Sequence, residues 1–243
     1  MTHTLVVSLG GNCAVAHNLR FREKRPYSLP FDWVYLVDDR PIRFWIDEVG
    51  RGFPDLLRRE NLIEMRPGDK EYAPAHADVK QYIDTASGYR FVNHFKESVE
   101  VPGAYETVSA SVRKRVERLL SAFSQGGDFL LVLATQVDVS VDLLKRLVAV
   151  LSARFPKARF TLRYMHFGQQ SDEIQTEDQG VVVQQVRRMM NDYDCRKTNW
   201  EWRFLDDIKV SECQKRRRCK VSFDVWPKVR CVISFKRKDR EEI

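Results

Sequence analysis

The residues best suited to chemistry lie near the N-terminus, in the sequence Ser8-Leu-Gly-Gly-Asn-Cys13. Glycines permit a tight turn where a strand ends, and the cysteine after them falls on the first turn of a helix. The N–H groups and the positive end of the dipole there favour a thiolate. With the amide of Asn12 they also suit the oxyanion of a tetrahedral intermediate. Cys13 is thus a candidate nucleophile, with a buried structural cysteine as the alternative.

A cysteine nucleophile needs a base within hydrogen-bonding distance, and histidine is the usual one. His94 and His166 each follow a predicted strand, as Cys13 does, and open α/β sheets bind ligands at the carboxyl ends of their strands. His17 lies one helical turn beyond Cys13, where we expect its ring to pack rather than to take a proton. A structural role is the alternative for each histidine. The other two, in the N-terminal end and in a polar loop, are His3 and His76.

A second segment rich in candidate functional residues is Ser28-Leu-Pro-Phe-Asp-Trp33, which contains a proline, two aromatic rings and a carboxylate. Asp32 is suited to orient a catalytic histidine in the correct tautomer. Equally, Phe31 and Trp33 can fill the core while Asp32 caps the following segment. The residues leave both interpretations open.

Strands and helices alternate along the chain, which predicts an α/β fold, a mostly parallel sheet with helices on its faces, in a single domain. Asn12 and Ser140 are the expected helix caps. Between residues 61 and 100 the only strand-like run is 89–93. The expected strands are 4–8, 128–135, 159–165, 181–186, 221–225 and 229–235. The expected helices are 13–21, 42–49, 53–60, 105–123, 141–153 and 200–208.

The composition is that of an ordinary globular protein, with 43% hydrophobic and 31% charged residues, and it excludes collagen-like and wholly disordered chains. The net charge of +7 comes entirely from the end of the chain, because Lys and Arg balance Asp and Glu through residue 194. The basic clusters are 215–220 and 236–238. They suggest an anionic partner such as nucleic acid, an anionic membrane surface or an acidic substrate, with a solvated charged face as the alternative. Tryptophans that offer stacking for bases, or else belong to the core, are Trp200, Trp202 and Trp226.

Five cysteines at irregular spacing form no C-x-x-C pair, so we expect neither a disulfide framework nor a zinc site. The pattern favours a reducing compartment, and we expect a cytoplasmic protein. The apolar start of the chain is interrupted by Gly10 and Gly11, which favours a buried strand over a signal peptide. No run reaches the ~20 apolar residues of a transmembrane helix. We expect no metal and no organic cofactor.

Taken together, the motifs Ser8–Cys13 and Ser28–Trp33 resemble a family of papain-like cysteine peptidases of otherwise unknown function. The third matching piece is Phe91-Val-Asn-His94-Phe95, although the acidic residue that often follows this histidine in the family is Phe95 here. The resemblance covers roughly residues 4 to 210. It also admits an α+β papain-like fold as an alternative.

The resemblance implies that Cys13 is the nucleophile, that His94 is the base and general acid, and that Asp32 orients the histidine. In papain-like enzymes the orienting residue normally follows the histidine, whereas Asp32 precedes it. Residues expected to bind the oxyanion or substrate are Asn12, Gly11, Ser8 and Trp33. The expected substrate is a small-molecule, peptide or glycan-linked ester, thioester or amide, since the family is associated with surface-polysaccharide and glycosyltransferase systems.

We therefore expect a thiol-enzyme domain over residues 1–210 and a basic C-terminal segment over residues 211–243, packed on the same domain. A different class of function is a non-catalytic binding module that uses the basic segment for an anionic partner. A third is a sugar- or nucleotide-dependent transferase on a Rossmann-like sheet, but the chain lacks a phosphate-binding signature. The sequence predicts no oligomeric state.

Overall fold

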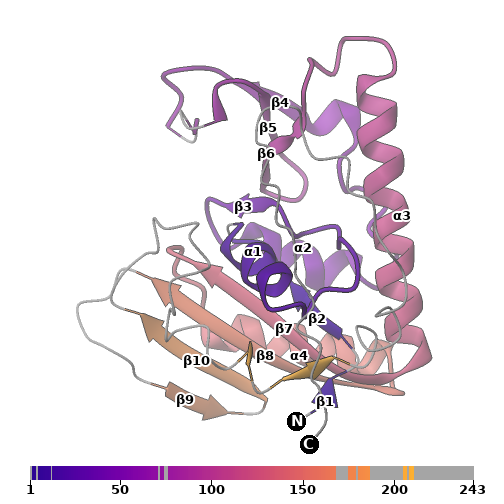
Figure 1. Ribbon diagram of the computed structural model, residues 1–243, viewed down its shortest axis with the longest axis vertical. Coiled ribbons are helices and arrows are strands. Elements are labelled where there is room, and N and C mark those ends of the chain that lie inside the picture. The colour runs from indigo at the N-terminus through magenta and orange to yellow at the C-terminus, as the bar shows by residue number, and fades with distance from the viewer. Residues whose placement is uncertain are drawn as a thin grey trace, which may run out of the picture.

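A five-stranded sheet forms the base of the protein (Figure 1). The computed structural model describes residues 2–3, 5–11, 13–70, 72–73, 76–167, 175–178, 180–186, 205–206 and 208–210. In order across the sheet, the strands are β2 (Leu5–Ser8), β7 (Gly127–Thr135), β8 (Ala158–Phe167), β10 (Val181–Val186) and β9 (Gln175–Asp178). The first four are parallel and β9 is antiparallel, which confirms the predicted α/β class.

Alternating side chains of this sheet pack into two cores. Val6 and Val132 lie in a core with Val15 and Leu19 of helix α1 (Ala14–Phe21). Leu5, Val7 and the residues in register with them on β7 lie in a second, larger core. Apolar residues on both faces explain why the β7 sequence is almost continuously hydrophobic.

A second, antiparallel sheet of four strands completes the large core, in the order β3 (Val34–Leu36), β6 (Tyr89–Phe95), β5 (Lys80–Asp84) and β4 (Leu62–Met65). Phe31 joins this sheet to the segment 40–53, because its ring contacts Tyr89 of β6 as well as Trp45 and Phe53. Helix α3 (Ala104–Gln125) runs along both sheets (Figure 1). A pair of two-residue parallel strands, β1 (Thr2–His3) and β11 (Lys209–Val210), lies beside β7.

The helices expected at 42–49, 105–123 and 141–153 are confirmed as α2 (Arg40–Glu48), α3 and α4 (Val141–Arg154). Ser140 caps α4, as expected, by accepting the N–H of Leu143 at 3.4 Å. No helix within the described residues is both long and apolar enough to cross a membrane.

The helix expected at 53–60 is wrong. The segment forms turns that lead into a short 3₁₀ helix, η1 (Arg59–Asn61). Phe53 and Leu57 adopt φ values of 57° and 58°, outside the helical region. The Leu57 N–H donates to the buried Asp84 carboxylate at 2.9 Å instead of to the carbonyl four residues earlier. A tertiary hydrogen bond therefore overrides the local preference.

Other expectations fall on residues that are not described. These are the strands at 221–225 and 229–235, nearly all of the helix at 200–208, and the basic segment 211–243 with its proposed packing. They remain predictions, as does the anionic partner.

Candidate active site

Cys13 lies at the N-cap of α1, immediately after the turn that leaves β2. Gly10 and Gly11 make this turn with φ values of 90° and 101°, which favour glycine. A Cβ atom on Gly11 would collide with the Ala134 carbonyl oxygen, so the turn packs directly on β7. The Cys13 thiol is free and 3% exposed. The N-cap of α1 is thus Cys13 and not the expected Asn12, which lies outside the described residues together with its expected role at the oxyanion.

The polar partner of the Cys13 thiol is Tyr35 on β3, with 3.2 Å between Sγ and the phenolic oxygen. Tyr35 pairs in register with Arg90 on β6, and the guanidinium carbon of Arg90 lies 5.0 Å from the Tyr35 ring centroid. A hydroxyl in this position can donate to a thiolate. Sequence reasoning missed Tyr35. The signal was its spacing of two from Trp33, which puts both side chains on one face of an extended segment.

His17 packs against Trp33, as the sequence analysis expected. The two rings meet edge to face with centroids 5.0 Å apart, and the Arg25 guanidinium lies 5.3 Å from the Trp33 ring. Burial lowers the pKa of His17, and Arg20 and Arg25 lower it further. Trp33 thus joins α1 to the loop that carries Arg25.

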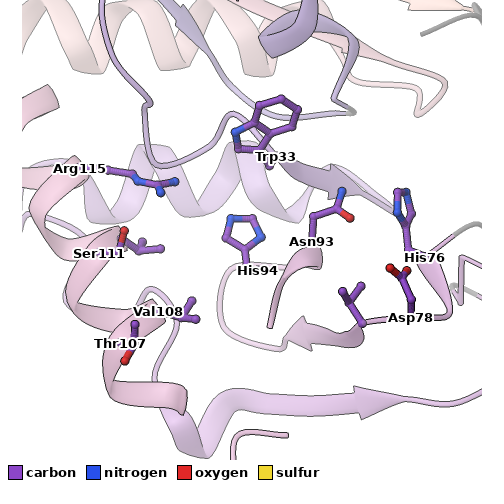
Figure 2. A pocket seen from close by; sticks show the side chains of 11 residues that line it. Trp33, His76, Asp78, Asn93, His94, Thr107, Val108, Ser111 and Arg115 are labelled. Atoms are coloured by element: carbon purple, nitrogen blue, oxygen red, sulfur yellow. The ribbon is translucent and has the colours of Figure 1, made fainter. Parts of the chain in front are cut away.

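On another side, Trp33 lines a cleft of about 780 Å³ (Figure 2). His94 of β6 lies at its centre, and Asn93, His76 and Arg115 also line it. The His94 ring packs edge-on against Phe91, with centroids 5.0 Å apart. Both ring nitrogens are buried and have no hydrogen-bond partner among the described residues. Burial, aided by the charge of Arg115, lowers the pKa of His94 to about 3, so the imidazole is neutral near pH 7.

Asp32 is completely buried beside this cleft. Its Oδ2 pairs with Arg25 Nη2 at 2.9 Å and accepts the Leu29 N–H at 2.6 Å. Burial raises the pKa of Asp32 to about 6, while Arg25 and the Leu29 N–H oppose that rise. Asp32 makes no hydrogen bond to His94, because both nitrogens of His94 are unpaired. In this structure the carboxylate organises the turn over residues 29–32.

Ser8, expected at the oxyanion or substrate site, uses its hydroxyl within the protein. Its Oγ accepts the Gly10 N–H at 3.1 Å and donates to the Phe31 carbonyl at 3.4 Å. These bonds tie the Cys13 turn to the segment that carries Asp32 and Trp33. The two motifs far apart in the sequence are thereby held side by side.

The described structure does not place Cys13 and His94 in a hydrogen bond. His166 lies at the carboxyl end of β8, two strands from β2 in the same sheet. Its Nε2 is 3.2 Å from the Gln136 carbonyl oxygen and 3.3 Å from Asp138 Oδ1. His166 is thus held by its own polar neighbours.

Arg115 is the second residue that sequence reasoning missed. It follows Val112 by three positions and precedes Leu119 by four, so it lies on the apolar stripe of α3. A charged residue on a buried stripe is the signal that could have identified it. Within the described residues, no group of three or more His, Cys, Asp or Glu side chains is arranged to hold a metal ion.

Fold and site describe an α/β protein with a free thiol at a strand–turn–helix junction and a histidine-lined cleft nearby. The chain belongs to the family described as "Putative papain-like cysteine peptidase (DUF1796)", whose model matches residues 4–170. The matched region contains Cys13, Asp32 and His94 and ends before the basic segment. No curated protein and no solved structure matches the chain.

Proposed function

We propose that this protein is a thiol enzyme that hydrolyses an ester, thioester or amide, or transfers its acyl group to an acceptor. Cys13 is the nucleophile and His94 the general base and acid. One observation carries the proposal: the Cys13 thiol lies at the N-cap of a helix, 3.2 Å from the Tyr35 hydroxyl. Membership in a family described as papain-like supports the reaction class.

In this reaction His94 takes the thiol proton, and the Cys13 thiolate attacks the substrate carbonyl carbon. The leaving group departs with the proton from His94, and water or an acceptor then releases the acyl group from the sulfur. The Tyr35 hydroxyl stabilises the thiolate, and N–H groups of the turn, together with Gly11 and Asn12, hold the oxyanion. Only a neutral imidazole can act as the base, and the low pKa of His94 keeps it neutral. Because so low a pKa also makes the ring a weak base, the mechanism requires bound substrate to raise the pKa towards neutrality.

Proton transfer from Cys13 to His94 needs a connection, because the described structure shows no hydrogen bond between them. Trp33 touches His17 of α1 and also lines the cleft beside His94, so this ring stands where the two halves of the site meet. A shift of Trp33 on substrate binding, or a bridging water, would link Cys13 to His94. Catalytic hydrogen bonds are often long before substrate binds.

The cleft volume of about 780 Å³ suits a small molecule or a short segment of a peptide or glycan. Because the sequence motifs resemble those of a family associated with surface-polysaccharide systems, a glycan-linked acyl group is among the proposed substrates. The irregular cysteines favour the cytoplasm as the place of the reaction.

The test is the rate of iodoacetamide alkylation at Cys13, followed by peptide mass spectrometry between pH 5 and pH 9. We expect rapid reaction at neutral pH in the wild type and a fall of about tenfold in His94→Ala and in Tyr35→Phe. His76→Ala is the matched control, because it also lines the cleft but has no role in the proposal. A Cys13 that reacts only after unfolding would refute the thiol mechanism.

A further inference from the structure

Arg115 presents a positive charge to the cleft. It extends from α3 towards the space between Trp33 and His94 (Figure 2). Within the part of the chain that the structure describes, its guanidinium makes no hydrogen bond and no ion pair. The Arg115 side chain is partly buried, so the group has lost part of its hydration, and this burial lowers its pKa. Five N–H donors of a partly desolvated cation are therefore available to a ligand.

The charges around Arg115 do not balance. Asp32 is the carboxylate whose field acts on both Arg25 and Arg115, and its Oδ2 is already paired with Arg25 at 2.9 Å. Arg118 adds repulsion from the next turn of α3. One buried carboxylate thus faces two partly buried guanidinium groups. A cation in such surroundings is stabilised by a further anion.

His94 supplies a second group that lacks a partner. Both of its ring nitrogens are buried and form no hydrogen bond with any residue that the structure describes, and the ring points into the same space as Arg115 (Figure 2). A neutral imidazole donates one N–H and so complements an oxygen acceptor. Asn93 lines the cleft beside it and offers an amide.

We propose that the cleft binds an anionic group of the substrate, either a carboxylate or a phosphate, between Arg115 and His94. Planar carboxylates and phosphates match the forked donors of arginine. The exposed carboxylate of Asp78 lines another part of the cleft and disfavours a polyanion there. The ligand is therefore a molecule with one anionic end. This inference rests on the proposed function only in calling the ligand a substrate, because binding can be measured without turnover.

The experiment is an NMR titration of the full-length protein labelled with ¹⁵N-histidine, using inorganic phosphate and acetate as separate probes. The His94 ring signals are assigned from their loss in His94→Asn. We expect these signals to shift to saturation, and Arg115→Gln to weaken binding about tenfold or more. Arg118→Gln is the matched control, because it removes the same charge from the same helix but does not line the cleft.

The stronger of the two probes identifies the anion as phosphate or carboxylate. Failure of both probes to shift His94, or equal weakening by Arg115→Gln and Arg118→Gln, would overturn the proposal. Thermal unfolding confirms that each variant folds. Cys13→Ala should retain anion binding, so a failed thiol mechanism and a failed anion site give different results.

Discussion

At the scale of single residues, His94 is held in an environment that disfavours its charged form. Its buried ring nitrogens have no hydrogen-bond partner in the described part of the chain, and an unpaired buried polar group costs about 1–3 kcal/mol of stability. Arg115 adds repulsion against a protonated ring. A ring that stays neutral and unpaired is suited to meet a ligand, but a pKa of about 3 makes it a weak proton acceptor. The proposed role as base therefore requires bound substrate to raise this pKa.

The low pKa of His94 predicts a loss of stability in acid. The folded-state pKa is about 3 and the unfolded value is about 6.5, so between these values the unfolded chain binds one more proton. The free energy of unfolding therefore falls as the pH falls below 6.5. From pH 6.5 to pH 5 this group alone should remove about 1.5 kcal/mol. Urea unfolding at both pH values measures the change.

His94→Gln is the comparison for this measurement, since it keeps a polar side chain that does not titrate. The variant should lose about 1.5 kcal/mol less than the wild type between pH 6.5 and pH 5. Asp32 has a raised pKa and so acts in the opposite direction below about pH 6, but it does so in both proteins. Equal pH dependence in the two proteins would contradict a depressed His94 pKa.

Sequence patterns identified those residues whose place in a turn or helix follows from the local sequence alone. Cys13 was expected on the first turn of a helix and lies at its N-cap, and His17, one turn later, packs against another ring as expected. The Tyr35 contact and the free charge of Arg115 depend on how α1, α3 and β3 meet. Local patterns could single out the two residues, but not the partners that they meet in the fold. Whether Asp32 and His94 act in catalysis stays a prediction.

At the scale of elements, the turn between β2 and α1 determines where Cys13 lies. Gly11 both adopts a φ of 101° and packs on the Ala134 carbonyl. Gly11→Ala should therefore lower the free energy of unfolding through backbone strain and through a steric clash. We also expect it to move the Cys13 thiol away from Tyr35. Chemical denaturation and Cys13 alkylation rates measure the two effects.

Gly68 provides the matched control, with a φ of 104° and no atom within 4 Å of an added Cβ. Gly68→Ala should cost about 1–2 kcal/mol from strain alone. Gly11→Ala should cost about 2 kcal/mol more because of the clash. Similar losses in both variants would mean that the close approach to β7 contributes little.

Elements with strong hydrophobic periodicity were predicted well, because apolar residues at helical spacing or in a continuous run indicate which side chains are buried. Strands β4 and β5 were missed because they are short, partly exposed and, in β5, paired with a register shift. The segment 53–60 was wrongly assigned because Asp84, distant in sequence, takes the Leu57 N–H. The conformation of such segments is determined by contacts with residues distant in sequence.

At the scale of the whole molecule, the two sheets share one core. A single cluster of buried side chains contains Leu131 of the parallel sheet and Phe91 of the antiparallel sheet. Phe31, within the second motif of the site, lies in the same cluster. The cleft and the Cys13 turn are therefore supported from both sheets. The expected domain over residues 1–210 is a prediction that this shared core makes testable.

Leu131→Ala should weaken both sheets together. Removing a fully buried leucine side chain costs about 2–5 kcal/mol, and in a cooperative unit this cost appears in every element. Hydrogen exchange by mass spectrometry should show equal loss of protection in peptides from β7–β8 and from β5–β6. Ile63→Ala, on a side chain that is 57% exposed, is the control and should change neither. Loss confined to β7–β8 would mean that the antiparallel sheet unfolds independently. The cleft would then lie in a unit separate from the parallel sheet beneath the Cys13 turn.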